Sequence, residues 1–306
     1  MSSRPRVIFL FVDGVGIGPD NQEHNPFASA DLPVLKSLLG GRLVFRGIAR
    51  RTRPGVSSRS VNATLGVPGL PQSGTGQTAL LTGINAPRLI GKHFGPYPYS
   101  TLRPLLEDRN LFVRLQHGGR RVEYVNAFPE RYFEYMAARP SRRSAVASAW
   151  LSTLRPLATS ARLARGEALS ADITSERWNS QGFPAVPELT PAGAGKRLAG
   201  LSREFDFTLF EYYETDHAGH SCSTQEALAV LAKLDEFVGG IVDEIDHAST
   251  LLILTSDHGN LEDLSTKSHT RNPVPLLAIG HRHSDAVRTI QSLVDVAPSI
   301  LRLLLK

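Results

Sequence analysis

Cysteine and long hydrophobic segments are what this sequence has least of. Cys222 is the single cysteine among the 306 residues, so no intrachain disulfide can form. A chain of this kind suits a reducing compartment, and we expect it to be cytoplasmic. The longest apolar run near the start, Val7 to Val12, is too short to span a bilayer. It also lacks the cleavage pattern of a secretory signal, so the sequence predicts no membrane partner.

Aromatic residues are also few, at 7%, and the charge is unevenly distributed. Residues 84–203 contain 18 Lys and Arg residues against 9 Asp and Glu residues, whereas the rest of the chain contains 16 against 20. Because few aromatic residues interleave with these arginines, we do not expect a nucleic-acid ligand. A basic segment joined to an acidic body instead predicts a small anionic substrate beside a cation site. The sequence leaves the oligomeric state open.

Continuous β-branched and aromatic runs predict strands that are buried on both faces of a sheet. The clearest are Arg6 to Val12, Phe205 to Tyr212 and Thr250 to Thr255. Helical stretches with one apolar face separate them, and the longest covers Thr224 to Ile245. This alternation predicts an α/β protein. A further strand is predicted at residues 274–279, helices at 25–39 and 293–304, and a loop at 61–71.

Residues 84–203 interrupt the alternation with ten prolines and short apolar helical stretches, such as Leu111 to Leu115 and Ala145 to Leu154. We therefore predict a smaller basic cap, inserted into a core made of residues 1–83 and 204–306. One strand inside the insert, Arg121 to Val125, is expected to rejoin the main sheet before most of the cap.

Three of the predicted buried strands are each followed by an aspartate. One candidate histidine comes after the second of these aspartates, and two come after the third. The carboxyl ends of strands are where open α/β sheets place their sites, so we expect the six side chains to lie together. Mixed carboxylate and imidazole ligands suit Mn²⁺ or Zn²⁺, and there are enough of them for two ions. The candidate ligands are Asp13, Asp216, His220, Asp257, His258 and His269.

A glycine-rich turn, Pro71 to Gly83, carries the candidate nucleophile Ser73. The turn is typical of one that leads into a helix N-terminus, where free amide groups favour an anion. Gly74 and Gly76 are expected to let the backbone approach a ligand. Beside two cations, the Ser73 hydroxyl would be deprotonated near neutral pH and could attack phosphorus. The alternative is that Ser73 is an ordinary helix cap.

In this order, the motifs resemble those of the alkaline phosphatase superfamily, and most of all the branch of the cofactor-independent phosphoglycerate mutases and phosphopentomutases. The resemblance covers about residues 5–83 and 204–306. The spacing of Thr82-Gly83 after the serine is also that of the superfamily. The resemblance rests on Asp13-Gly14, the turn at Ser73, Asp216 to His220, Asp257 to Asn260, and His269 to Pro275.

This resemblance implies a three-layer α/β/α sandwich with a largely parallel central sheet and two divalent ions, Mn²⁺ or Zn²⁺. It also implies how the ligands divide between the two ions. One ion would be held by Asp216, His220 and His269, and the other by Asp13, Ser73, Asp257 and His258.

Two departures from the mutases bear on the reaction. Ser73 is followed by Gly-Thr-Gly-Gln, where the mutases have Glu-Val-Gly-His, and the insert is shorter than the large domain of the bacterial mutases. We therefore predict hydrolysis of a phosphate ester through a phosphoserine at Ser73, as a phosphatase or phosphodiesterase. A phosphomutase is the alternative, and a non-catalytic metal-binding protein is the second alternative.

A minority of the basic residues in the insert are expected to face the metals and to bind the non-reacting part of an anionic substrate. The residues that we assign to substrate binding are Lys92 and His93, which should lie near the hinge of the cap, and Arg271.

Overall fold

The computed structural model describes residues 4–45, 51–183 and 185–306, and a seven-stranded sheet forms its centre. The strands are β1 (Arg6–Val12), β2 (Arg51–Arg53), β3 (Val56–Val61), β4 (Val122–Tyr124), β7 (Phe207–Tyr212), β8 (Thr250–Thr255) and β9 (Val274–Gly280). Their order across the sheet is β2-β3-β9-β8-β1-β7-β4. The strands β8, β1, β7 and β4 are parallel to one another, whereas β9 and β2 are antiparallel to their neighbours, so the sheet is mostly parallel.

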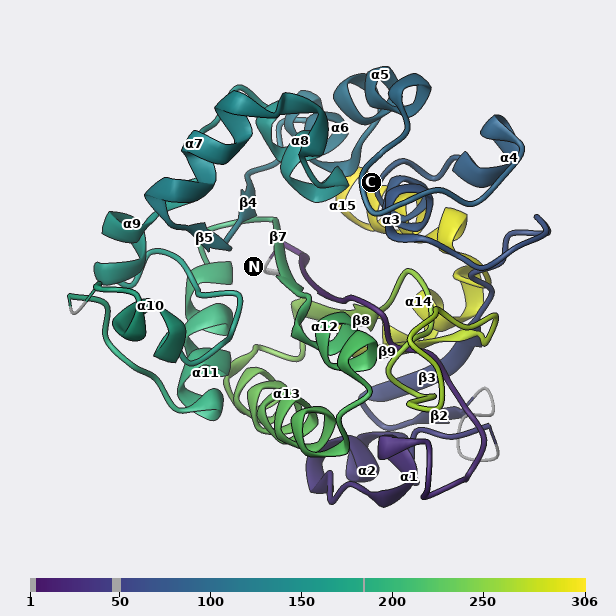
Figure 1. Cartoon of the computed structure of the whole chain (residues 1–306). Helices are drawn as coiled ribbons and strands as arrows, with labels where there is room; N and C mark the ends of the chain where they lie inside the picture. Colours follow the sequence, from purple (N-terminus) through teal and green to yellow (C-terminus); the bar gives the residue numbers. More distant parts are fainter. Residues whose placement is uncertain (1–3, 46–50, 184) are drawn as a thin grey trace.

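Side chains of β1 alternate between two cores, one on each face of the sheet. Val7 and Phe9 belong to the first core, and Ile8 and Leu10 to the second. Helices cover both faces, so the predicted three-layer α/β/α sandwich is confirmed (Figure 1).

The first core packs under one layer of helices and the second core under another. The first layer contains α3 (Ser73–Thr82), α5 (Arg103–Asp108), α6 (Leu111–His117), α8 (Ala145–Leu151), α14 (His283–Thr289), the turn η3 (Leu293–Asp295) and α15 (Val296–Leu305). The second layer contains α1 (Pro26–Ser29), α2 (Pro33–Leu39), α11 (Pro191–Ser202), α12 (Glu214–Ser221) and α13 (Thr224–Glu244).

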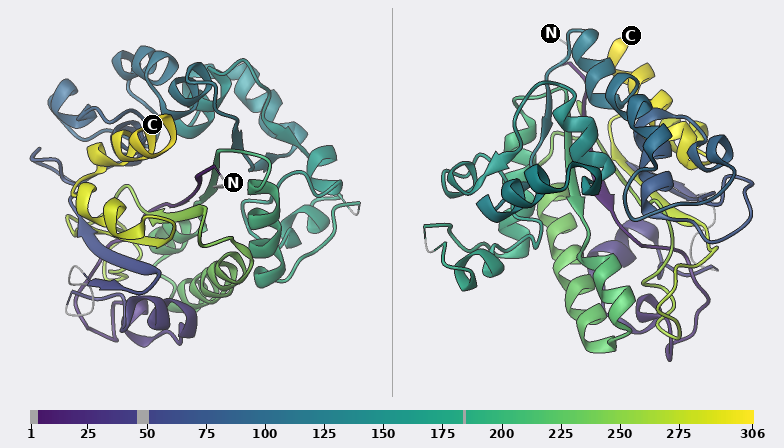
Figure 2. Two further views of the ribbon diagram at one scale, coloured as in Figure 1. Left: turned by 180° about the vertical axis from the view of Figure 1, so that it is seen from behind. Right: turned by 45° about the horizontal axis from the view of Figure 1, so that its top comes forward.

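A small third core lies apart from these two, and Trp178 is its largest side chain. We call the elements around it, together with the neighbouring α7 (Glu130–Ala138) and η2 (Pro140–Arg142), the cap lobe, which projects to one side of the molecule beyond β4 (Figures 1 and 2). The cap lobe consists of β5 (Ala127–Phe128), α7, η2, β6 (Ala158–Thr159), α9 (Ser160–Ala164) and α10 (Glu176–Ser180). Met136 of α7 belongs to the first core.

The segment proposed as the insert, residues 84–203, therefore contains more than the cap lobe. It also supplies β4, as expected, and the helices α5, α6, α8 and α11 of the two main layers. The remaining elements of this segment are α4 (Ala86–Ile90) and the turn η1 (Ser100–Leu102). The division into core and insert stays a prediction.

Two local features differ from the sequence-based expectations. The helix predicted at 25–39 is interrupted, because Pro33 begins α2 and disfavours helical geometry at Leu32, which has φ −124° and ψ 72°. The strands β2 and β3 were not predicted, because their sequences are rich in Arg and Ser and they lie at the edge of the sheet. Across the described parts of the chain, no helix combines the length and the apolar character needed to cross a membrane.

The arrangement of β7, β1 and β8 positions the site. These three strands are adjacent and parallel, and Val12 pairs with Tyr212 while Phe11 pairs with Thr255. Their carboxyl ends therefore meet at one edge, where open α/β sheets bind their ligands.

Candidate metal centre

The chain segments that follow β1, β7 and β8 bring three carboxylates together. Asp13 directly follows β1, Asp216 lies in the first turn of α12 after β7, and Asp257 follows β8. Gly14 has a φ of +68°, and a Cβ at this position would lie 2.5 Å from Oδ1 of Asp216. Only glycine permits both this backbone conformation and this approach.

The first group of side chains is fully enclosed. Nε2 of His258 lies 3.3 Å from Oδ1 of Asp13 and 3.5 Å from Oδ2 of Asp257. It also lies 3.0 Å from Oγ of Ser73. Asp257 and His258 are each 0% exposed, and Asp13 is 7% exposed.

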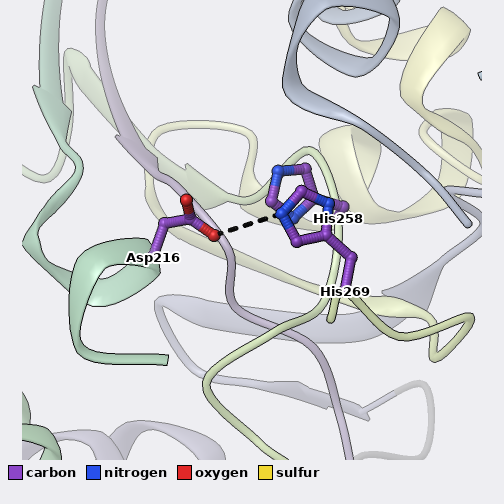
Figure 3. A group of neighbouring side chains, drawn as sticks. All are labelled: Asp216, His258 and His269. Carbon is purple, nitrogen blue, oxygen red and sulfur yellow. Dashed lines mark ion pairs between the residues drawn. The ribbon is translucent and has the colours of Figure 1, made fainter. Parts of the chain in front are cut away.

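The second group lies beside the first and is more open to solvent. Nε2 of His220 lies 3.3 Å from Oδ2 of Asp216 and 3.2 Å from Nε2 of His269. Nε2 of His269 lies 3.7 Å from Oδ1 of Asp216 (Figure 3). The His220 side chain is 43% exposed.

His258 joins the two groups. Its ring stacks on the ring of His269 with a centroid distance of 3.8 Å and an interplanar angle of 15°. One nitrogen of His258, one nitrogen of His269 and one oxygen of Asp216 lie within 4.8 Å of one another. One ligand atom from each of Asp13, Asp257 and His258 also lies within 4.8 Å of the other two. The structure thus brings together all seven predicted metal-site residues, with His258 between the two groups rather than in only one.

Unsatisfied polar atoms show that these residues fit a cation. Oδ1 of Asp13, Oδ2 of Asp257 and Nδ1 of His258 are buried without a hydrogen-bond partner, as is Oδ1 of Asn260. Leaving such atoms unpaired in a protein interior costs free energy, and a bound divalent cation would offset that cost. Carboxylate oxygens and imidazole nitrogens are suitable donors for Mn²⁺ or Zn²⁺.

The ionisation of the cluster points in the same direction. Burial raises the pKa of Asp13 well above its usual value, and the neighbouring carboxylates of Asp257, Asp216 and Glu211 raise it further. A cation would remove this penalty on the charged form. Burial and then the charge of His258 hold the pKa of His269 below its usual value, which keeps the imidazole neutral, as a metal ligand must be.

Backbone carbonyls orient two of the histidines. Nδ1 of His269 donates to the carbonyl of Pro71 at 2.8 Å, and Nδ1 of His220 donates to the carbonyl of Lys267 at 2.7 Å. Because a carbonyl oxygen can only accept, the proton is on Nδ1 in both rings and the lone pair of Nε2 faces the cluster. Such outer hydrogen bonds are typical of histidines that bind metals.

Ser73 is the first residue of α3, so it lies at the positive end of the helix dipole. The two nearby glycines have a different role from the one expected. A Cβ on Gly74 would lie 2.3 Å from the carbonyl oxygen of Tyr97, and one on Gly76 would lie 2.9 Å from that of Asp257. These glycines let α3 pack against the protein's own backbone.

Three supporting residues were missed as site residues by the sequence reasoning. Nε2 of Gln77 donates to Oδ2 of Asp13 at 3.1 Å, and Nδ2 of Asn260 donates to Oδ1 of Asp216 at 2.7 Å. Gln77 and Asn260 both belong to motifs named in the sequence analysis, so a role at the site could have been predicted for them. No motif includes Glu262, so its role could not be predicted from the sequence.

Glu262 ties three loops together from a buried position, where it is 1% exposed. Its Oε2 accepts from the backbone amides of Gly16 at 2.8 Å and Asn260 at 2.9 Å. Its Oε1 accepts from Nδ2 of Asn272 at 3.0 Å and from Oγ1 of Thr270. One carboxylate therefore holds the loops that carry Asp13, His258 and His269.

A cavity of about 680 Å³ opens from the metal centre toward the cap lobe. Ser73, Asp13 and Asp216 line its inner end, and residues of the cap lobe line the opposite wall. A substrate in this cavity would therefore contact both the candidate nucleophile and the cap lobe.

The residues assigned to substrate binding, Lys92, His93 and Arg271, are not among those that line this cavity. Nζ of Lys92 lies 5.7 Å from the centroid of the Phe94 ring. Nε2 of His93 lies 3.3 Å from the carbonyl of Val67, and Arg271 is exposed. Their role stays a prediction, and the arginines of the cavity wall are instead Arg131 and Arg177.

The family comparison matches the part of the chain that carries most of the candidate ligands. Residues 189–306 match the model of the metalloenzyme superfamily. This range contains five of the seven site residues, namely Asp216, His220, Asp257, His258 and His269.

Curated relatives match a similar share of the chain. A 2,3-bisphosphoglycerate-independent phosphoglycerate mutase of Thermomicrobium roseum is 31% identical over 131 residues, which is 39% of this chain and 24% of the relative. The corresponding protein of Pseudomonas putida is 35% identical over 131 residues, which is 40% of this chain and 25% of the relative. The matches thus span about a quarter of the length of these relatives.

Solved structures resemble the chain over nearly its whole length. The PH0037 protein of Pyrococcus horikoshii has a TM-score of 0.59 and 14% identity, covering 99% of this chain and 98% of that protein. The alkaline phosphatase of the Antarctic bacterium TAB5 has a TM-score of 0.54 and 12% identity, covering 99% of both chains. The fold is therefore alkaline phosphatase-like.

The predicted resemblance is confirmed, since residues 189–306 match the metalloenzyme superfamily and the fold is like that of an alkaline phosphatase. The match indicates that the chain binds a divalent metal.

Proposed function

We propose that this protein is a phosphohydrolase that uses two divalent metal ions, Mn²⁺ or Zn²⁺, and forms a phosphoserine at Ser73. The observation that supports this most directly is the position of Ser73. Its hydroxyl lies 3.0 Å from Nε2 of His258, at the start of a helix and at the inner end of the cavity.

The two groups of side chains would each hold one ion. Asp216, His220 and His269 form one set, and Asp13, Ser73, Asp257 and His258 the other, with His258 near both. When bound, the ions supply positive charge that lowers the pKa of the serine hydroxyl and stabilises the charge on phosphoryl oxygens.

The protein's own groups position the reactants. Oγ of Ser73 forms a bond to phosphorus while the bond from phosphorus to the leaving alcohol breaks, and the proton of the serine passes to solvent. Water then attacks phosphorus, which releases phosphate and restores Ser73. The amides at the start of α3 favour the anionic phosphoryl group, and Asn260 and Gln77 hold the carboxylates of Asp216 and Asp13 in place.

A phosphomutase is the second candidate, because the curated relatives named above are mutases. In that case the phosphoserine would return its phosphoryl group to the dephosphorylated substrate, and no phosphate would be released. A non-catalytic metal-binding protein is the remaining alternative.

The test is turnover of p-nitrophenyl phosphate and its bis-ester by protein loaded with Mn²⁺ or Zn²⁺. We expect release of p-nitrophenol and phosphate, and metal analysis close to two ions per chain. Absence of turnover on every phosphate ester would contradict the proposal and favour the metal-binding alternative. Conversion of a phosphorylated sugar or acid into its isomer without free phosphate would favour the mutase.

Replacement of the nucleophile makes the test specific. Ser73→Ala should lower kcat by several orders of magnitude, as for other catalytic nucleophiles, with an unchanged circular dichroism spectrum. Mass spectrometry of protein quenched during turnover should place the phosphoryl group on Ser73. Phosphorylation of Thr75 or Thr78 instead would reassign the nucleophile.

A further inference from the structure

The cap-side wall of the cavity contains a cluster of aromatic side chains. Among the described residues, aromatic side chains contribute to this wall from three separate stretches of the chain around the cap lobe and one at the end of β7. They are Tyr97, Phe128, Tyr132, Tyr135, Trp178 and Tyr213. No local pattern in the sequence predicts this cluster, since aromatic residues are only 7% of the chain.

Two of these rings stack on each other, which leaves one ring face of Tyr132 uncovered by Phe128. Phe128 and Tyr132 stack with a centroid distance of 4.4 Å and an interplanar angle of 22°. Phe128 also contacts the buried ring of Tyr124 at 6.0 Å, which supports it from behind. Rings that are packed in this way keep a fixed orientation and offer a rigid stacking surface to a planar ligand.

Positive and negative side chains are equal in number on this wall, and one pair is in direct contact. Nη1 of Arg177 lies 2.6 Å from Oε1 of Glu214, whereas Nη2 of Arg131 donates to the neutral amide oxygen Oε1 of Gln181 at 2.6 Å. Asp172 accepts hydrogen bonds from the backbone amides of Ser175 and Arg177 and from the hydroxyl of Ser170.

The basic character of residues 84–203 therefore does not extend into the cavity. Of the 18 Lys and Arg residues in this segment, only Arg131 and Arg177 line the cavity, and Asp172 and Glu214 on the same wall balance them. The side chains of this wall therefore carry no net charge, and the expectation that a minority of the basic residues bind the non-reacting part of the substrate stays a prediction.

From these observations we infer that the substrate is a phosphate monoester of an uncharged alcohol that carries a planar ring, such as a nucleoside or an aryl alcohol. The inference rests on the proposed function and names the substrate class of the same site. The phosphoryl group lies at Ser73, and the ring stacks across the cavity on Tyr132, which Phe128 supports from its other face. A volume of about 680 Å³ accommodates a ligand of this size, since small-molecule sites span about 300–1,000 Å³.

Two matched pairs of substrates test the ring and the charge separately. Adenosine 5′-monophosphate and ribose 5-phosphate share the same primary alcohol and differ in the base. We expect kcat/KM to be about tenfold or more higher for the nucleotide, because stacking of one base on an aromatic side chain is worth about this much. A ratio near one would overturn the inference.

3-Phosphoglycerate and glycerol 3-phosphate form the second pair, and they differ by one carboxylate. We expect the carboxylate to give no gain in kcat/KM. A gain that shrinks as the salt concentration rises would show a free cationic subsite and would overturn the inference.

Variants of the stacking surface locate the effect. Phe128→Leu and Tyr132→Leu should each bring the ratio between nucleotide and ribose phosphate toward one, whereas Tyr132→Phe should keep it. Phe45→Leu is a matched control, since Phe45 is 48% exposed and lies outside the cavity, and it should leave the ratio unchanged. A ratio that is the same in Phe128→Leu, Tyr132→Leu and the control would overturn the inference.

A binding measurement separates this inference from the proposed reaction. Trp178 lines the cavity, so adenosine 5′-monophosphate should change the tryptophan fluorescence of the Ser73→Ala protein, and ribose 5-phosphate should change it less. Equal responses would count against the stacking surface. Failure of every ester to turn over, with selective binding of the nucleotide retained, would contradict the proposed hydrolysis and leave the binding site in place.

Discussion

The two ends of the cavity differ in whether their charged side chains have partners. At the metal centre, oxygens of Asp13 and Asp257 are buried without a hydrogen-bond partner. At the cap-side wall, Arg177 is paired with Glu214 at 2.6 Å. Uncompensated buried charge is costly and persists where it binds something, whereas compensated charge contributes to a stable wall. This difference supports the proposal that the metal centre carries out the chemistry and the cap-side wall selects the substrate.

The largest effect should come from removing one of the uncompensated charges. We expect Asp257→Asn to lower kcat by several orders of magnitude and to weaken metal binding. The same change should raise the melting temperature of the metal-free protein, because it relieves the repulsion that raises the pKa of Asp13. Turnover of p-nitrophenyl phosphate and thermal unfolding in a chelator measure the two effects.

Asp172→Asn is the matched control at the opposite wall. Because Asp172 accepts hydrogen bonds from two backbone amides, its replacement should lower the melting temperature with and without metal. If Asp257→Asn and Asp172→Asn both stabilise the metal-free protein, or if neither does, the metal centre and the cap-side wall do not differ in this way.

Metal content should distinguish the histidines within the centre. His269→Ala should lose one of the two ions, whereas His258→Ala should lose both, because His258 lies between the two groups. Elemental analysis after dialysis against Mn²⁺ checks this. An unchanged metal content in His269→Ala would exclude this residue from the site.

Glu211 should make stability depend on pH at the boundary between centre and wall. Burial, opposed by the hydrogen bond from Tyr124, raises the pKa of Glu211 to about 7. Its contribution to stability is therefore complete below the ordinary pKa of about 4.5 and is lost as the pH rises through 7. As the pH rises, the metal-free protein should lose about 3 kcal/mol of its free energy of unfolding through this group, and Glu211→Gln should avoid that loss.

Urea unfolding of both proteins from pH 4.5 to pH 8.5 measures this difference. The advantage of Glu211→Gln should be small at pH 4.5 and largest at pH 8.5. An advantage that does not change with pH would show that Glu211 ionises normally in the folded state.

The smallest effect should come from Glu262, which touches no reacting atom and acts by holding three loops. We expect Glu262→Gln to weaken metal affinity by about 10–100-fold, which is typical for residues that support metal ligands. At saturating metal, the activity of Glu262→Gln should be closer to that of the unchanged protein than its metal affinity is. Competition with a fluorescent chelator measures the affinity, and an affinity equal to that of the unchanged protein would contradict this positioning role.

The sequence was sufficient to predict the alternation of strands and helices and the cluster of ligands. Long apolar runs such as β1 and β8 favour buried strands in any context, because they would expose large apolar surfaces elsewhere. The ligand residues stand within short motifs at the ends of these strands, and parallel neighbouring strands place such ends together. Asp13, Asp257 and His258 could thus be named before the fold was known.

Long-range packing decided the rest. Glu262 takes its role from contacts that include Gly16, far away in the sequence, and no local pattern reports such contacts. Phe128 and Tyr132 stack on each other locally, but only the tertiary structure places them in the same cavity as Ser73.

The charge of the cap is the clearest example, since the sequence of residues 84–203 could not say which of its 18 basic residues would face the cavity. Folding directs nearly all of them away from the cavity and pairs Arg177 with Glu214, because a buried or partly buried charge is stable only beside a partner.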